Sequence, residues 1–198
     1  MKKFYYIIVL IMIYSLSFAQ TSKTESVVSI RGTAIKSIGE IKEIWETGSA
    51  IYVSYENISR INQFSYMFQV GYINFKENPD YNFEGDDAKF NIIPLQVGGR
   101  YYITLQTIRP FLMAMTGINV FSSKYPLKPA RDTNKEDMYS GTFVKLNFQV
   151  GLGLAVKLFS NLQLEVLANY NSHVLDAPTH YNVTGLEIGA GLNWTLSN

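Results

Sequence analysis

An alternation of apolar and polar residues with a period of two limits the fold of this chain more than any other feature. Between residues 144 and 158 every even position is Val, Leu or Phe, whereas the odd positions are Lys, Asn, Gln, Gly or Ala. Successive side chains of a β-strand leave opposite faces, so this segment is predicted to be a strand with one apolar face and one small or polar face. Segments 93–103, 162–170 and 186–196 alternate in the same way. After residue 19 no apolar run reaches 18 residues, and the sequence therefore predicts no membrane-spanning helix.

Eight strands are predicted along the chain, and the connections between them alternate in length. Short turns on one side and long loops on the other are typical of an up-and-down transmembrane barrel with both termini on the side of the short turns. The predicted strands cover 24–34, 46–57, 63–76, 89–104, 109–123, 142–159, 161–174 and 181–196. The tight turns are 57–60, 104–107 and 160–161, and the long polar loops are 77–88, 124–141 and 175–180.

The segment after the first predicted strand breaks the alternation. Ile35, Ile38, Ile41 and Ile44 recur every three residues, which is closer to the period of a helix than to that of a strand. We therefore expect an irregular loop or a short helix in this part of the first long connection.

Composition indicates which face of the strands points outward, a question that the alternation leaves open. A soluble barrel that binds a lipid has the same period with its apolar face turned inward. Only 17% of the residues are charged, and Gly, Ala, Asn and Gln dominate the polar faces, where a solvated surface would carry Lys and Glu. An eight-stranded barrel has an interior just wide enough for its own side chains, which suits such residues. We predict an all-β, eight-stranded antiparallel up-and-down transmembrane barrel with a filled polar lumen over residues 20–198; the alternative is a soluble secreted lipid-binding barrel.

Aromatic residues gather at the two ends of the predicted strands. Rings with an apolar body and a polar tip favour the two interfaces between a membrane and water, so these residues are predicted to form two outward-facing bands. One band consists of Tyr55, Phe64, Tyr101, Phe111, Phe159 and Trp194, and the other of Tyr72, Phe75, Phe90, Phe121, Tyr125, Phe143, Tyr170 and Tyr181.

The first 19 residues have the pattern of a secretory signal peptide. Lys2 and Lys3 precede an almost wholly apolar run over 4–16, and small residues then stand at 17 and 19, where a signal peptidase reads the chain. The apolar run is shorter than the ~20 residues of a spanning helix, and we expect cleavage after Ala19. The chain has no cysteine, which excludes a lipidated N-terminal Cys, a disulfide scaffold and a cysteine-ligated metal. Its 17 basic and 16 acidic residues exclude a nucleic-acid binder driven by charge.

Four stretches carry a resemblance to a known family: IIPLQVGGRYY (92–102), RPFL (109–112), QVGLG (149–153) and GAGLNW (189–194). Over 24–198 the chain resembles the small bacterial outer-membrane β-barrels, the eight-stranded relatives of the transmembrane domain of outer-membrane protein A and of outer-membrane protein X. The resemblance implies location in the bacterial outer membrane, with membrane lipid, lipopolysaccharide and the barrel-assembly machinery as partners. It also implies a structural or adhesive role in envelope integrity, without catalysis, cofactor or metal. A small pore and a lipid-active barrel enzyme are the alternatives.

Seven charged residues project from the polar faces of the predicted strands. Buried charges are stable only when they are paired, so we predict a network of salt bridges that closes the lumen. Arg100 with Glu165 and Glu187 is the first pairing expected. The predicted network consists of Arg31, Glu56, Arg100, Lys145, Lys157, Glu165 and Glu187.

Two further groups of residues are candidates for sites of chemistry. Ser172, His173, Asp176 and His180 have the residue types of a lipid-modifying barrel enzyme, but Ser172 and His173 are adjacent and leave opposite faces of a strand. Polar residues at a loop tip are therefore the preferred interpretation.

Residues 80–85 (DYNFEG) fit the opening of a calcium-binding loop, but Asn91 stands where the bidentate Glu belongs. A solvated acidic loop, bridged by divalent cations to lipopolysaccharide phosphates, is preferred. The loops 77–88 and 124–141 are the predicted places for an extracellular ligand.

Overall fold

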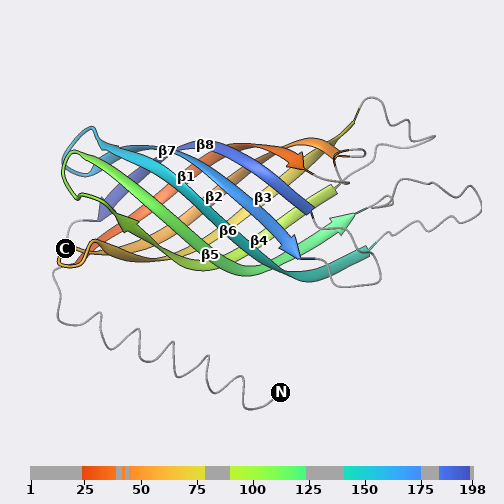
Figure 1. Cartoon of the computed structure of the whole chain (residues 1–198), viewed down its shortest axis with the longest axis horizontal. Coiled ribbons are helices and arrows are strands. Elements are labelled where there is room, and N and C mark those ends of the chain that lie inside the picture. Colours follow the sequence, from red (N-terminus) through yellow and green to blue (C-terminus); the bar gives the residue numbers. More distant parts are fainter. Residues whose placement is uncertain are drawn as a thin grey trace, which may run out of the picture.

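Eight antiparallel strands close into one barrel (Figure 1). The computed structural model describes residues 24–38, 42, 45–78, 90–123, 141–174 and 183–196. Each strand pairs with its neighbours in the chain, and β1 pairs with β8 to close the sheet. The predicted fold class is confirmed. The strands are β1 (Thr24–Ile38), β2 (Trp45–Ser59), β3 (Phe64–Glu77), β4 (Phe90–Tyr102), β5 (Ile108–Ser123), β6 (Gly141–Lys157), β7 (Leu162–Val174) and β8 (Val183–Leu196).

The barrel has two distinct ends. At the turn end, residues 60–63, 103–107 and 158–161 join β2 to β3, β4 to β5 and β6 to β7, and β1 begins and β8 ends there. The loop end is the opposite one, where the remaining four connections join the strands. Among the described residues no helix is long and apolar enough to cross a membrane.

The first strand is longer than the sequence predicts, and the expectation of a loop or helix at Ile35 and Ile38 is wrong. Both residues belong to β1, where Ile35 pairs with Gly48 of β2 on one side and with Glu187 of β8 on the other. Hydrogen-bonded ladders on both sides hold the segment extended, which overrides its local three-residue period. Ile41 and Ile44 lie outside the described residues.

The two faces of each strand meet different surroundings, as β6 shows. Gln149 is only 1% exposed, whereas its neighbour Val150 is 53% exposed. In β4, too, the polar side chain is buried and the apolar one is exposed, since Arg100 is buried and Val97 is exposed. Apolar side chains therefore cover the outside of the barrel, and polar side chains fill its interior.

Glycines in the strands leave room for the larger interior side chains. A Cβ added at Gly71 would lie 2.4 Å from the ring of Tyr52, and one added at Gly153 would lie 2.3 Å from the ring of Phe111. The rings occupy the space above these glycines and so help to fill the lumen. An eight-stranded interior is narrow enough for side chains alone to close it.

Candidate functional site: the closed lumen

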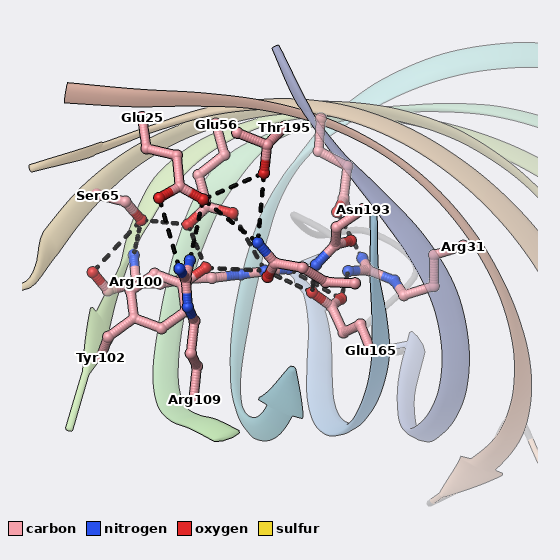
Figure 2. Close-up of polar contacts among 12 residues, drawn as sticks. Glu25, Arg31, Glu56, Ser65, Arg100, Tyr102, Arg109, Glu165, Asn193 and Thr195 are labelled. Carbon is pink, nitrogen blue, oxygen red and sulfur yellow. Dashed lines mark hydrogen bonds and ion pairs between the residues drawn. The ribbon is translucent and has the colours of Figure 1, made fainter. Parts of the chain in front are cut away.

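Two arginines and two glutamates form a central ion network across the lumen (Figure 2). Arg100 of β4 binds Glu165 of β7 through both terminal nitrogens, with Nη1–Oε2 and Nη2–Oε1 distances of 2.6 and 3.0 Å. Arg31 of β1 donates to the same carboxylate at 3.2 Å, and Arg100 also lies 3.2 Å from Glu56 of β2. The network thus joins the neighbouring strands β1 and β2 to β4 and β7 across the interior.

Neutral side chains complete the central ion network. The Tyr102 hydroxyl donates to Glu56 at 2.8 Å, and the Ser65 hydroxyl donates to the same Glu56 oxygen. Asn193 donates to Glu165 at 3.0 Å. The guanidinium of Arg100 also lies 4.4 Å from the centre of the Phe111 ring, a cation–π contact. Ionised groups buried this deeply are stable only with such additional hydrogen bonds, so the network braces the interior.

A chain of amides continues from this network across the barrel. Arg31 donates to Gln69, which donates to Gln96 at 2.7 Å, and Gln96 donates to Asn147 at 2.9 Å. Asn147 then donates to Asn119, also at 2.9 Å. These residues belong to five strands, so the polar contacts span the lumen from wall to wall.

A second ionic cluster lies at the turn end. Glu25 of β1 pairs with Arg109 of β5 at 3.0 Å, and it accepts a further bond at 3.2 Å from Thr195 of β8 (Figure 2). The exposed Arg60 lies 3.5 Å from the same carboxylate. This cluster ties the first and last strands to the opposite wall of the barrel.

At the loop end the interior is aromatic. Phe90 lies 5.3 to 5.9 Å, centre to centre, from the rings of Phe75, Trp45 and Phe121, and all four side chains are at most 4% exposed. We call these four residues the aromatic cap. Trp45 faces inward because the register of β2 against β3 shifts between Trp45 and Thr47, which reverses the alternation at that point. The lumen is therefore closed by rings at the loop end and by ions further inside.

Five of the seven charged residues predicted for the lumen are fully buried, namely Arg31, Glu56, Arg100, Glu165 and Glu187. The structure brings Arg100 to Glu165, as expected, and to Glu56. The expected contact of Arg100 with Glu187 is absent from the described ion pairs, since Glu187 accepts from Gln149 and Asn171.

The two lysines of the predicted network lie elsewhere. Lys157 is exposed at the end of β6, where the strand reaches the turn end, so its placement in the lumen is wrong. Lys145 is half-buried in β6 and makes no ion pair within the described part of the chain.

Most of the predicted interface aromatics do point outward. Those exposed by 39% to 67% are Tyr55, Phe64, Tyr72, Tyr101, Phe159, Tyr170 and Trp194. The prediction is wrong for Phe111 and Phe121, and also for Phe75 and Phe90, which are buried in the lumen. Each of these four stands two residues from another buried interior residue of its strand and therefore lies on the inner face. Tyr125, Tyr181 and the side chain of Phe143 lie outside the described residues.

The candidates for enzyme chemistry and for a calcium loop are mostly beyond the described residues. Ser172 is half-buried in β7, and His173 follows it in the same strand. Asp176, His180, residues 80–85, loop 124–140 and the signal segment 1–19 are not described. Within the described ranges no group of three or more His, Cys, Asp or Glu residues is arranged to hold a metal ion.

Sequence reasoning missed Glu25, Arg109 and Trp45. Glu25 and Arg109 lie near predicted strand ends, and only their contact across the barrel identifies them as partners. For Phe121 the sequence does contain a signal for an inward position. It stands two residues from the polar Asn119 in β5 and therefore lies on the same, inner face. For Trp45 the register shift removes any such signal.

Comparison with solved structures gives this fold a class. The neisserial surface protein A, NspA, matches with a TM-score of 0.59 and 17% identity, over 86% of this chain and 97% of that one. A major outer membrane protein of Thermus thermophilus matches with a TM-score of 0.51 and 10% identity, over 86% and 99%. The N-terminal β-barrel domain of Pseudomonas aeruginosa OprF reaches 0.49 at 11% identity, over 88% and 100%. A scan of protein-family models and a search of curated proteins gave no match.

The chain thus has the fold of the small eight-stranded outer-membrane β-barrels. The resemblance drawn from the sequence is confirmed at the level of the fold.

Proposed function

We propose that this protein is an integral barrel of the bacterial outer membrane with a structural or adhesive role and no catalytic activity. Export by a signal peptide cleaved after Ala19 and insertion by the barrel-assembly machinery belong to this proposal. Its surroundings are membrane lipid and the lipopolysaccharide of the outer leaflet. The loops 77–88 and 124–141 are the parts proposed to meet a ligand outside the cell.

The observation that carries the proposal is that the outer face of the sheet is apolar and the inner face is polar, the reverse of a barrel in water. Side chains such as Leu152 and Ile188 are 60% and 71% exposed on the outside, whereas Arg100 and Glu165 are fully buried inside. A barrel in water would expose this apolar belt at a large cost, because each square ångström of apolar surface in water costs about 25 cal/mol. In a bilayer the same belt is favourable, so a membrane barrel is supported over a soluble lipid-binding one.

The filled lumen argues against the small-pore alternative. The central ion network links β1, β2, β4 and β7, and the aromatic cap lies beyond it at the loop end. An ion crossing the barrel would have to break several charge-assisted hydrogen bonds, each worth roughly 1.5–3 kcal/mol. We expect planar-bilayer recordings of the purified protein to show no steady single-channel conductance, and large steady channels would overturn this part of the proposal.

Replacing the loops distinguishes a structural role from an adhesive one. Loops 79–88 and 124–140 are replaced together by short Gly-Ser connections, and the variant is compared with the intact chain in cells that lack the protein. Folding of both is checked by heat-modifiable migration on gels, and surface exposure by protease added to whole cells.

If the role is structural, the loop-less barrel restores resistance to detergent as well as the intact chain does. If it is adhesive, adherence of the cells to a surface needs the intact loops. Failure of the intact chain to change either property would contradict the proposed role.

A further inference from the structure

Glu187 differs from every other buried carboxylate in the described part of the chain. Glu25, Glu56 and Glu165 each pair with arginine, whereas no described ion pair includes Glu187. Its side chain is nevertheless fully buried on the lumenal face of β8. An isolated carboxylate in such a place is costly unless a cation or strong hydrogen bonds compensate it.

Two amide side chains lie beside this carboxylate and donate hydrogen bonds to it. Oε2 of Glu187 accepts from Nε2 of Gln149 at 3.1 Å and from Nδ2 of Asn171. The amide oxygens of these two residues are bonded to the same carbons as the donating nitrogens, so they lie beside Glu187. Neither oxygen has a hydrogen-bond partner, and no hydrogen bond reaches Oε1 of Glu187 at normal geometry. The hydroxyl of the buried Tyr52 of β2 also interacts with the Glu187 carboxylate.

Asn169 adds a fourth oxygen of the same kind. It pairs directly with Glu187 across β7 and β8, it is 3% exposed, and neither its Oδ1 nor its Nδ2 has a partner. Its other neighbour in the ladder is Gly151, where an added Cβ would lie 1.9 Å from Oδ1 of Asn169. The absence of a side chain at Gly151 therefore leaves the space in which the Asn169 amide lies.

We propose that Glu187, Gln149, Asn169 and Asn171 form an oxygen-lined site that binds a single hard cation, Na⁺ or Ca²⁺, inside the lumen. One negative charge and several oxygens without donors are the ligands that hard cations take in proteins. A proton on Glu187 would satisfy only one of these oxygens, whereas a cation compensates the carboxylate and the amide oxygens together. The site lies in the lumen toward the loop end, four residues along β8 from Gly191, which pairs with Arg31.

The other charged groups near the site have partners or lie at its edge. The guanidinium of Arg31 pairs with Glu165 and lies 5.0 Å from the centre of the Tyr52 ring. Lys145 stands four residues from Gln149 in β6, toward the loop end, and its ammonium is the rival source of compensating charge. The variant Lys145→Ala distinguishes a bound cation from the Lys145 ammonium as the source of this charge.

The test refolds the intact mature chain from urea and chelator into detergent micelles. The buffer contains choline, sodium or calcium chloride at equal ionic strength, and choline is too large to enter the site. Thermal unfolding is followed by circular dichroism, and calcium retained after gel filtration is measured by elemental mass spectrometry. We expect a higher unfolding temperature in sodium or calcium than in choline. Retained calcium would identify the bound ion as divalent, whereas stabilisation by sodium alone would identify it as monovalent.

Three variants make the result specific. Glu187→Gln is expected to abolish the dependence on the cation, whereas Glu46→Gln, a change at the half-exposed carboxylate of β2, keeps it. Asn171→Asp adds a second carboxylate and is expected to make unfolding more dependent on calcium. Equal unfolding temperatures of the wild type in all three salts, without retained calcium, would overturn the proposal. So would loss of the cation dependence in Lys145→Ala with the dependence intact in Glu187→Gln.

Discussion

The inside and the outside of this barrel are built from alternate residues of the same strands, yet they follow opposite rules. In β6, Gln149 is buried among polar groups while Val150 faces outward. With the proposed placement in a membrane, the aliphatic side chains on the outside need only be compatible with lipid, so any one of them contributes little specific energy. On the inside, each arginine has named partners at hydrogen-bond distance. The stability and specificity of this fold therefore depend mainly on the lumen, whereas the outer face determines the solvent that the fold requires.

The largest effect is expected where one carboxylate serves two arginines. Glu165→Gln keeps the shape of the side chain but leaves Arg31 and Arg100 without their shared charge. Because breaking a buried ion pair leaves an uncompensated charge, we expect a loss of about 3–5 kcal/mol, measured by urea unfolding in phospholipid vesicles with tryptophan fluorescence. The control is Lys157→Gln at an exposed position, which is expected to change stability by less than about 0.5 kcal/mol. Equal stability of the two variants would contradict the role given to the lumen.

A charge on the outer face is expected to have the next largest effect. Leu152→Arg places a cation in the belt that we propose faces lipid, where the cost at the middle of the bilayer is about 2–4 kcal/mol. Leu158→Arg makes the same change at the turn end, where the cost falls to about 0–1 kcal/mol. Vesicle unfolding of the two variants gives the difference directly. If both variants unfold like the wild type, the outer face does not contact lipid.

Two glycines on opposite faces give the smallest and most local test. Gly71→Ala places a Cβ against the Tyr52 ring in the lumen, whereas a Cβ at Gly32 meets nothing within 4 Å. Forcing extra volume into a packed interior costs about 1–3 kcal/mol, so Gly71→Ala is expected to lose that much. Gly32→Ala is expected to be neutral or slightly stabilising, because alanine restricts the unfolded chain more than glycine does. The opposite order of the two variants would show that the faces have been exchanged.

The sequence predicts the strands and their faces well because both depend on local alternation. Gln149 and Val150 are assigned to opposite faces from the period alone, and the structure agrees. The failures arise where a non-local contact overrides the local pattern. Ile35 is extended because β2 and β8 pair with it, and Trp45 turns inward because the register of β2 shifts beside it.

The lumen is predictable in kind but not in detail. Charged residues on faces that line the lumen must be paired, and Arg100 does pair with Glu165. The second partner of Arg100 is Glu56 and not Glu187. This choice depends on how β2, β4, β7 and β8 are staggered around the barrel. This stagger is set by the register of all eight strands together, which no single segment of sequence encodes.

Spin labels test most directly whether lipid surrounds the aliphatic outer face. Labels are placed singly at Leu152 and Leu192 of the outer face, and at Ile61, which is 76% exposed in the turn between β2 and β3, as an aqueous reference. In reconstituted vesicles we expect relaxation by oxygen at the first two positions and by a water-soluble nickel complex at Ile61. Nickel access at Leu152 and Leu192 equal to that at Ile61 would contradict this expectation.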